Sequence, residues 1–334
     1  MILDARPLQP EFVPADVRHR DGEIDALTST LKPVVQGHHA EPALLHGPSG
    51  TGKTCIARYA VERLREQVVD LDTQYVNCWE DYTRFKALYR VLDGLDHAFD
   101  VHRQSTPRDE LLDRLRDALD HPYVVVLDEV DQLEHKGILY DLHRVSGLSI
   151  VLVANADEEL FAGLEERVAS RFKTATRIHF DRYGTRELVG ILEDRVRWGL
   201  HDEAATADQL RLIADLAGGD ARVAIGTLRA AAQSADQRGL HQLTEETIER
   251  SAPEAKSEIK QKNLEKLTDH QRTLYDIIEE GGEVPPDALY EAYREAIAEP
   301  KSRRMVRNYL EKMRRYNLVE ATGEGRARTY APLS

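Results

Sequence analysis

The residues with the clearest chemical meaning form the glycine-rich segment GPSGTGKT, at Gly47–Thr54. This segment fits the pattern G-x-x-x-x-G-K-[ST] in full, and it lies between a short apolar run and a segment with helical spacing. Gly50 and Gly52 can adopt backbone angles that turn successive N–H groups toward a chain of phosphates. Lys53 would then reach the β- and γ-phosphates, while the Thr54 hydroxyl would ligate Mg²⁺. The sequence therefore predicts a site for ATP or ADP with Mg²⁺, whose loop contacts are Gly47, Pro48, Ser49, Gly50, Thr51, Gly52, Lys53, Thr54 and Cys55.

A pair of acids follows a second apolar run, in VVVLDEVD at Val124–Asp131. The run predicts a buried strand that carries Asp128 and Glu129 to its carboxyl end, where open α/β sheets bind their ligands. We expect Asp128 to hold Mg²⁺ and Glu129 to orient or deprotonate an attacking water. A strand that ends in two solvated acids is the alternative. Beside the phosphate loop, the pair instead indicates transfer of a phosphoryl group to water.

Strands and helices alternate around these motifs, which predicts an α/β unit with a parallel sheet. The predicted strands are Ala43–His46, Tyr123–Leu127 and Ser149–Ala154. The predicted helices are Arg18–Leu31, Thr54–Val69 and Asp109–Leu119. From Gly184 to Ile259 only helical spacing remains, so a small helical second domain is expected there.

The C-terminal segment has a different pattern. Helices are predicted at Asp269–Glu279, Asp287–Ala298 and Ser302–Tyr316, and a hairpin at Leu318–Ala321 and Arg328–Ala331. Three short helices followed by a β-hairpin are typical of the winged variant of helix-turn-helix. Residues 301–334 carry nine Lys or Arg against three Glu, whereas the whole chain has a net charge of −14. Such a local reversal of charge favours contact with nucleic acid.

The third of these helices has two distinct faces. Val306, Leu310 and Met313 recur at helical spacing and are expected to face the core, with Tyr309 beside them. The other face is basic, as a helix in the major groove of duplex DNA requires. The predicted DNA contacts are Arg303, Arg304, Arg307 and Arg314, with Arg315 extending the face and Arg326 and Arg328 on the hairpin. A solvated charged face, or a winged helix that binds protein, is the alternative.

Composition narrows the class of protein. At 334 residues, two or three domains are expected. No apolar run is long enough to span a bilayer and no export signal is visible, so we expect a soluble, cytoplasmic protein with no membrane partner. Cys55 and Cys78 lack the spacing of a zinc site or a disulfide framework.

The order of these motifs resembles the AAA+ superfamily. That resemblance implies that Asn155, in SIVLVANAD, is the first sensor, a polar residue between the γ-phosphate and the water. It places the arginine finger, which reaches a neighbouring subunit's site, at Arg167 or Arg171 in ERVASRF, with Arg167 favoured. Arg222, in GGDARVAI, matches the second sensor. Each arginine taken singly could instead be an ordinary surface cation.

The whole chain resembles the archaeal replication-initiator ATPases, relatives of the origin recognition complex and the cell-division-control loader. Its Arg-rich, Lys-poor, acidic composition also resembles proteins of salt-loving archaea. The resemblance implies an α/β P-loop AAA+ core, an α-helical lid and a C-terminal winged-helix domain. The bounds expected are 1–16 for an N-terminal extension, 17–183 for the core, 184–259 for the lid and 260–334 for the winged helix. The opening PADVRHRDGEIDAL looks like the family's adenine-side segment, so Val17 and Arg18 become nucleotide contacts.

The same resemblance implies a function. Such proteins bind double-stranded DNA at a replication origin, act with other initiator subunits and help recruit or load the replicative helicase. A weak ATPase, stimulated by assembly, would switch them between ATP and ADP states. The family's extra DNA-contacting insertion would fall in Trp79–Phe99, where the match is loose. A nucleotide-gated regulator of transcription or plasmid maintenance, with incidental hydrolysis, is the alternative, and a clamp-loader-like protein is disfavoured by the winged helix.

Overall fold

The computed structural model describes residues 1–98, 101, 107–162, 164, 166–323 and 325–333. The chain divides into two compact units, Met1–Glu245 and Glu246–Ser334, and each is described by itself. Across the described ranges, no helix combines the length and the apolar character that crossing a membrane requires.

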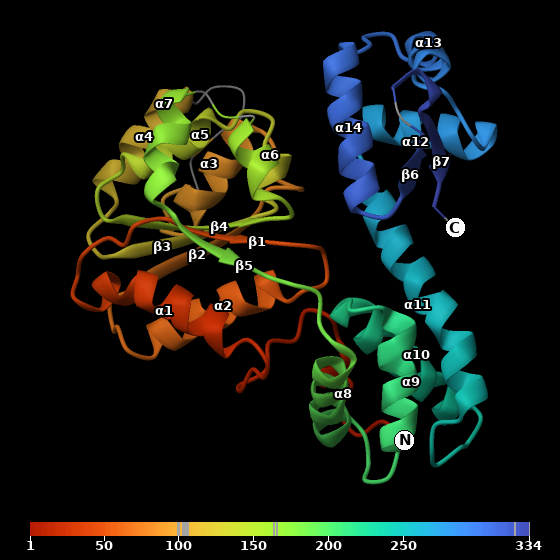
Figure 1. The fold of residues 1–334 in the computed structure, drawn as a ribbon. Helices are drawn as coiled ribbons and strands as arrows, with labels where there is room; N and C mark the ends of the chain where they lie inside the picture. Colours follow the sequence, from red (N-terminus) through yellow and green to blue (C-terminus); the bar gives the residue numbers. More distant parts are fainter. Residues whose placement is uncertain (99–100, 102–106, 163, 165, 324, 334) are drawn as a thin grey trace. The chain divides into compact units, whose positions relative to one another are not determined.

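A five-stranded parallel sheet forms the centre of the first unit (Figure 1). Its order is β2-β3-β4-β1-β5, so the strand before the phosphate loop lies between β4 and β5. The strands are β1 (Ala43–His46), β2 (Asp72–Asn77), β3 (Tyr123–Asp128), β4 (Leu148–Ala154) and β5 (Thr176–His179). Every residue of β3 and β4 is buried, as expected for inner parallel strands that are covered on both faces.

Helices cover both faces of this sheet. Figure 1 shows α1 and α2 on one face and α3, α4, α5, α6 and α7 on the other. These helices are α1 (Asp21–Val35), α2 (Lys53–Arg65), α3 (Arg84–Asp93), α4 (Arg108–Asp117), α5 (Gly137–His143), α6 (Asp157–Ala162) and α7 (Glu166–Arg171). Alternate residues of β3 belong to different cores, because Val125 and Leu127 pack on the α3 side while Val124 and Val126 pack on the α2 side. The expected α/β core is therefore confirmed.

The two edge strands, β2 and β5, were not predicted from the sequence. Most of β2 is half-buried and polar, and β5 alternates between buried and exposed residues, so neither reads as a continuous apolar run. Two helices that pack on the sheet have bounds that differ from expectation by three or four residues. The first helix begins at Asp21 instead of Arg18, runs through Pro33 and ends at Val35, and α2 ends at Arg65 instead of Val69.

Three helices complete the first unit: α8 (Thr185–Gly199), α9 (Ala207–Ala217) and α10 (Ala221–Gln237). Their ends follow local chemistry. Thr206 caps α9 through its side chain, Gly218 ends it in a left-handed conformation, and the Asp220 carboxylate accepts from two N–H groups of α10. These three helices match the helical segment that the sequence predicted.

The N-terminal residues, as far as Phe12, contact these helices. The N–H of Leu3 donates to the carbonyl of Gly199 over 2.9 Å, and Leu8 is buried. The Arg195 guanidinium, itself buried, donates to the carbonyls of Pro7 at 2.6 Å and Phe12 at 3.2 Å. The segment expected only as an extension is thus tied to α8.

The second unit contains α12 (Asp269–Gly281), α13 (Pro286–Ala296), α14 (Arg303–Arg315) and an antiparallel hairpin of β6 (Val319–Thr322) and β7 (Thr329–Pro332), preceded by α11 (Glu245–Glu265). An antiparallel bridge from Val284 to Tyr330 adds the segment before α13 to the hairpin. The predicted inner face of α14 is confirmed, because Val306, Leu310 and Met313 are buried.

Candidate nucleotide-binding site

The glycine-rich loop adopts the backbone that its sequence predicts. Gly47, Gly50 and Gly52 have φ angles of +142°, +78° and +91°, which side-chain-bearing residues rarely adopt. Space is also limiting. A Cβ on Gly52 would lie 2.5 Å from the Tyr183 hydroxyl, and one on Gly50 would overlap the Asp220 carboxylate. Gly52 then opens α2, so the N–H groups of the first turn of the helix lie at the loop.

Lys53 lies folded against the loop. Its Nζ donates to the carbonyls of Gly47 and Pro48, both at 2.7 Å, and to Asn155 Oδ1 at 3.3 Å. Burial lowers the pKa of Lys53 to about 8, although the nearby Asp128 carboxylate opposes that shift. Two neutral carbonyls do not compensate the charge of the buried Lys53 ammonium, so a negatively charged phosphate would be a more favourable partner.

The Asp128 carboxylate accepts hydrogen bonds from Thr54, Tyr75 and the backbone of Glu129. Its Oδ2 accepts from the Thr54 hydroxyl at 2.7 Å and from the Tyr75 hydroxyl at 2.6 Å. Its Oδ1 accepts from the N–H of Glu129 at 2.8 Å, and Glu129 has a left-handed φ of +53°. Thr54 and Asp128, which the sequence placed at the metal, are therefore in direct contact although 74 residues separate them.

These oxygen donors fit Mg²⁺. Magnesium binds hydroxyl and carboxylate oxygens, keeps several waters and takes its remaining ligands from phosphates. Among the described residues, no group of three or more His, Cys, Asp or Glu is arranged to hold a metal ion.

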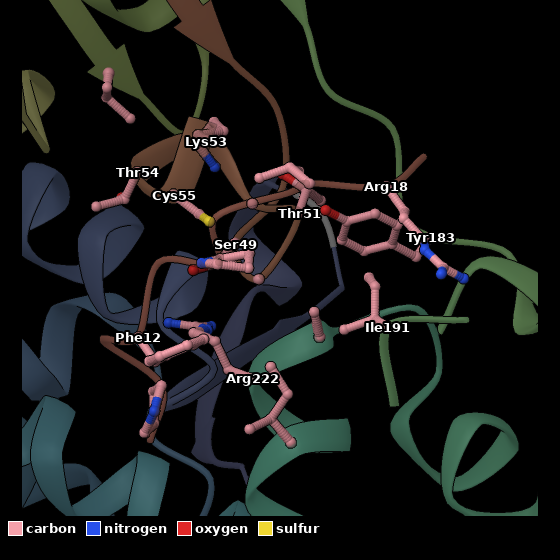
Figure 2. A pocket seen from close by; sticks show the side chains of 18 of the residues that line it. Phe12, Arg18, Ser49, Thr51, Lys53, Thr54, Cys55, Tyr183, Ile191 and Arg222 are labelled. Carbon is pink, nitrogen blue, oxygen red and sulfur yellow. The ribbon is translucent and has the colours of Figure 1, made fainter. Parts of the chain in front are cut away.

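A cavity of about 200 Å³ lies beside the loop and collects most of the predicted contacts (Figure 2). Gly47 and Pro48 are the exceptions among the loop residues, because they do not line it and instead hold Lys53. The predicted residues that line it are Val17, Arg18, Ser49, Gly50, Thr51, Gly52, Lys53, Thr54, Cys55, Asp128, Glu129, Asn155 and Arg222. Asn155 follows the last residue of β4, and Arg222 is in the first turn of α10.

Arg222 lines the cavity and is held by Asp220, which was not among the predicted site residues. The Asp220 carboxylate, which is buried, lies 3.1 Å from Nη2 of Arg222 and also accepts from its backbone N–H at 2.9 Å. The two glycines before Asp220 indicate a helix that restarts at this residue, and polar residues at helix starts commonly accept such bonds.

The far end of the cavity is formed by α8 and the N-terminal segment. Arg18 forms an ion pair with Asp194 of α8 at 3.1 Å. Asp194 also binds Arg197 at 2.6 Å. The Phe12 ring lies 4.9 Å from the buried Arg195 guanidinium. Figure 2 shows Phe12, Ile191 and Arg222 around the same opening as Lys53 and Ser49. No sequence motif marks Phe12 or Ile191.

The two candidate finger arginines lie on α7. The side chain of Arg167 falls outside the described part of the structure. The Arg171 guanidinium lies 4.8 Å from the centre of the Tyr140 ring, and the side chain is exposed.

The predicted DNA contacts of the second unit differ in their surroundings. Arg303 binds Asp287 and lies 3.6 Å from Glu291, and Arg314 lies 2.8 Å from Glu311. Arg304 and Arg307 are exposed and make no ion pair with any described residue. Arg328 is half-buried, and the side chain of Arg326 lies outside the described part. The basic face is therefore partly neutralised by acids of the same unit.

Comparison with protein families identifies two regions of the first unit. Residues 17–153 match the AAA ATPase domain, and residues 189–253 match the Cdc6 AAA+ ATPase-type lid domain. The lid match contains Arg222 and ends beyond α10.

Two curated relatives cover almost the whole chain. It is 55% identical to ORC1-type DNA replication protein 1 of Halobacterium salinarum, over 92% of this chain and 100% of the relative. It is 45% identical to ORC1-type DNA replication protein 9 of the same organism, over 99% and 94%.

Two solved structures of archaeal ORC proteins are similar to this chain over nearly its whole length. The ORC1 protein of Aeropyrum pernix, solved in complex with DNA, superposes with a TM-score of 0.79 at 25% identity, over 100% of this chain and 94% of that one. The Aeropyrum pernix ORC2 protein, solved as ADPNP-ADP complexes, has a TM-score of 0.71 at 23% identity, over 99% and 94%, and shares the fold.

Proposed function

Because the chain belongs to the family of ORC1-type DNA replication proteins, an AAA+ family with a Cdc6-type lid, we propose that it is an ATP-dependent replication initiator. In this role it binds origin DNA, acts with other initiator subunits and helps recruit or load the replicative helicase. The observation that carries the proposal is the convergence of loop, acid pair, Asn155 and Arg222 on one cavity.

The chemistry at this cavity is slow hydrolysis of ATP. Lys53 leaves its carbonyl partners for the β- and γ-phosphates, and the loop N–H groups bind their oxygens. Thr54 and Asp128 would hold Mg²⁺, which neutralises phosphate charge when bound. Glu129 and Asn155 orient the attacking water, and an arginine of a neighbouring subunit, Arg167 by preference, completes the charge stabilisation.

The lid can report which nucleotide is bound. Arg222 follows directly on the Asp220–Ala221 turn that touches Gly50, so a γ-phosphate that draws Arg222 away from Asp220 acts on the start of α10. A differential contact of this kind is what a nucleotide switch requires, because a ligand shifts an equilibrium only by its preference for one state.

DNA binding is assigned to the second unit. Three helices with a bridged hairpin support its assignment as a winged helix, with α14 as the helix that enters the major groove. Arg304 and Arg307, exposed and without acidic partners among the described residues, are the best candidates for phosphate or guanine contacts. The Aeropyrum pernix ORC1 protein, which was solved in complex with DNA, supports DNA binding by this chain.

The proposal is tested by footprinting the purified protein on the replication origins of its own replicon, with ATP and with ADP. An initiator is expected to protect origin repeats, and the extent of protection should differ between the two nucleotides. Lys53→Ala should lose the nucleotide dependence, whereas Lys32→Ala, at the end of α1 and away from the cavity, should retain it. Genome-wide occupancy confined to promoters would contradict the initiator role and favour a nucleotide-gated regulator.

A further inference from the structure

A tyrosine outside the sequence motifs contacts the acid assigned to the metal. The Tyr75 hydroxyl donates to Asp128 Oδ2 over 2.6 Å, and the same oxygen accepts from Thr54 over 2.7 Å. Tyr75 does not line the cavity and so does not face the nucleotide. It can act on bound nucleotide only through Asp128.

The sheet register brings these two residues together. Tyr75 of β2 pairs with Val126 of β3, two residues before Asp128. Because side chains two residues apart on a strand lie on the same face, Tyr75 and Asp128 share one face of the sheet. The pairing of β2 with β3 is therefore what delivers the hydroxyl to the carboxylate.

Tyr75 is itself fixed in place. The Arg58 guanidinium, from the helix that follows the phosphate loop, lies over the Tyr75 ring at 4.1 Å from its centre. A tyrosine hydroxyl ordinarily keeps its proton at neutral pH, so Tyr75 is the donor in its bond to the Asp128 carboxylate.

Together these contacts restrain the whole Asp128 carboxylate. Two hydroxyl donors hold Oδ2 and the Glu129 N–H holds Oδ1, so the group cannot turn without losing a bond. Thr54 lines the cavity and would also hold Mg²⁺, whereas Tyr75 lies outside the cavity and is free to serve Asp128 alone. Hydrogen bonds that orient a ligand group are commonly worth 10- to 100-fold in metal affinity or activity.

We propose that Tyr75 is a positioning residue for Mg²⁺-dependent nucleotide binding and hydrolysis, which it supports by fixing the Asp128 carboxylate. This inference rests on the proposed ATPase function of the site. It differs from that function in naming a residue that touches neither nucleotide nor metal.

The matched control comes from the next strand. Tyr123 of β3 is buried, and its hydroxyl donates to the carbonyl of Val91 at 2.5 Å, away from the site. Tyr75→Phe and Tyr123→Phe therefore each remove one hydrogen-bonded hydroxyl from neighbouring strands and leave the ring. Only the first removes a bond to Asp128.

The experiment measures the affinity for ADP, with a fluorescent ADP as the probe, in EDTA and across a Mg²⁺ titration, together with kcat for ATP hydrolysis. Tyr75→Phe is expected to bind ADP in EDTA as the wild type does, and to need about 10-fold more Mg²⁺ for half-maximal effect. Its kcat should fall while its KM for the nucleotide at saturating Mg²⁺ changes little. Tyr123→Phe should match the wild type in all of these.

The inference is overturned if Tyr75→Phe and Tyr123→Phe have the same Mg²⁺ requirement and the same kcat. It is also overturned if Tyr75→Phe weakens ADP binding equally with and without Mg²⁺, because a general loss of structure would do that. If the affinity of the wild-type protein for ADP does not depend on Mg²⁺, the proposed function is overturned instead. The wild-type titration shows this outcome before either variant is measured.

Discussion

The backbone N–H of Ala221 donates to the carbonyl of Gly50 over 2.9 Å, and this bond joins the first turn of α10 to the phosphate loop. The Asp220 carboxylate fills the space where Gly50 lacks a side chain. The sequence motifs of loop and lid, about 170 residues apart, therefore meet through backbone and a buried acid. Because of these contacts, a displacement of the phosphate loop also displaces the start of α10, and the reverse.

Gly50→Ala tests this contact. The new methyl group would overlap the Asp220 carboxylate and would require a left-handed backbone, which costs about 1–2 kcal/mol for a residue with a Cβ. We expect a lower melting temperature and loss of most ATP affinity, measured by thermal unfolding and calorimetry. In a double-mutant cycle, Asp220→Ala should recover part of the melting temperature by removing the overlap. Strictly additive losses would show that the two residues do not interact.

The pH dependence of nucleotide binding follows from Lys53. Its pKa of about 8 in the nucleotide-free protein means that the ammonium loses its proton as pH rises through 8. Phosphate prefers the charged form, so the affinity for ADP in EDTA should change little between about pH 7 and pH 8 and fall by up to about 10-fold per pH unit above it. Lys53→Arg keeps its charge throughout this range and should bind with little pH dependence. A wild-type affinity that stays level to pH 9.5 would contradict the prediction.

The choice of arginine finger is tested by mixing subunits. Arg167→Ala is expected to bind ATP normally and to lose the stimulation of hydrolysis that assembly provides, a loss of about 10³-fold or more where such fingers are known. Mixing it with Glu129→Gln, which keeps its arginine but cannot activate water, should restore some hydrolysis at wild-type Glu129 sites. Arg171→Ala is the comparison variant, and the prediction fails if it alone loses stimulation.

The arginines of α14 are expected to contribute unequally to DNA binding. Arg307→Ala should weaken duplex binding and reduce the slope of log affinity against log salt by about one, because an exposed cation is removed from the phosphates. Arg303→Ala should cost less, since Asp287 and Glu291 already neutralise that side chain. Fluorescence anisotropy across a salt series separates the two variants. Equal effects would mean that Arg303 leaves its acidic partners on binding DNA.

Several parts of this protein are determined by local sequence. The phosphate loop needs glycines at fixed spacing followed by Lys53 and Thr54, and the φ angles of Gly50 and Gly52 agree with that requirement. The inner strands β3 and β4 are continuous apolar runs because both their faces are buried. The inward face of α14 follows the helical period. In each case the signal lies within a few neighbouring residues.

Tertiary structure alone decided the rest, because the remaining contacts join segments that no local pattern connects. The edge strand β2 is half polar, yet its pairing with β3 places Tyr75 on Asp128. Packing of the first residues against α8 brings Phe12 to the nucleotide cavity, and the Asp220 turn reaches Gly50 only because the lid folds back on the loop. The sequence determined which groups could bind a nucleotide and its metal, whereas their orientation depended on hydrogen bonds and packing between distant parts of the chain.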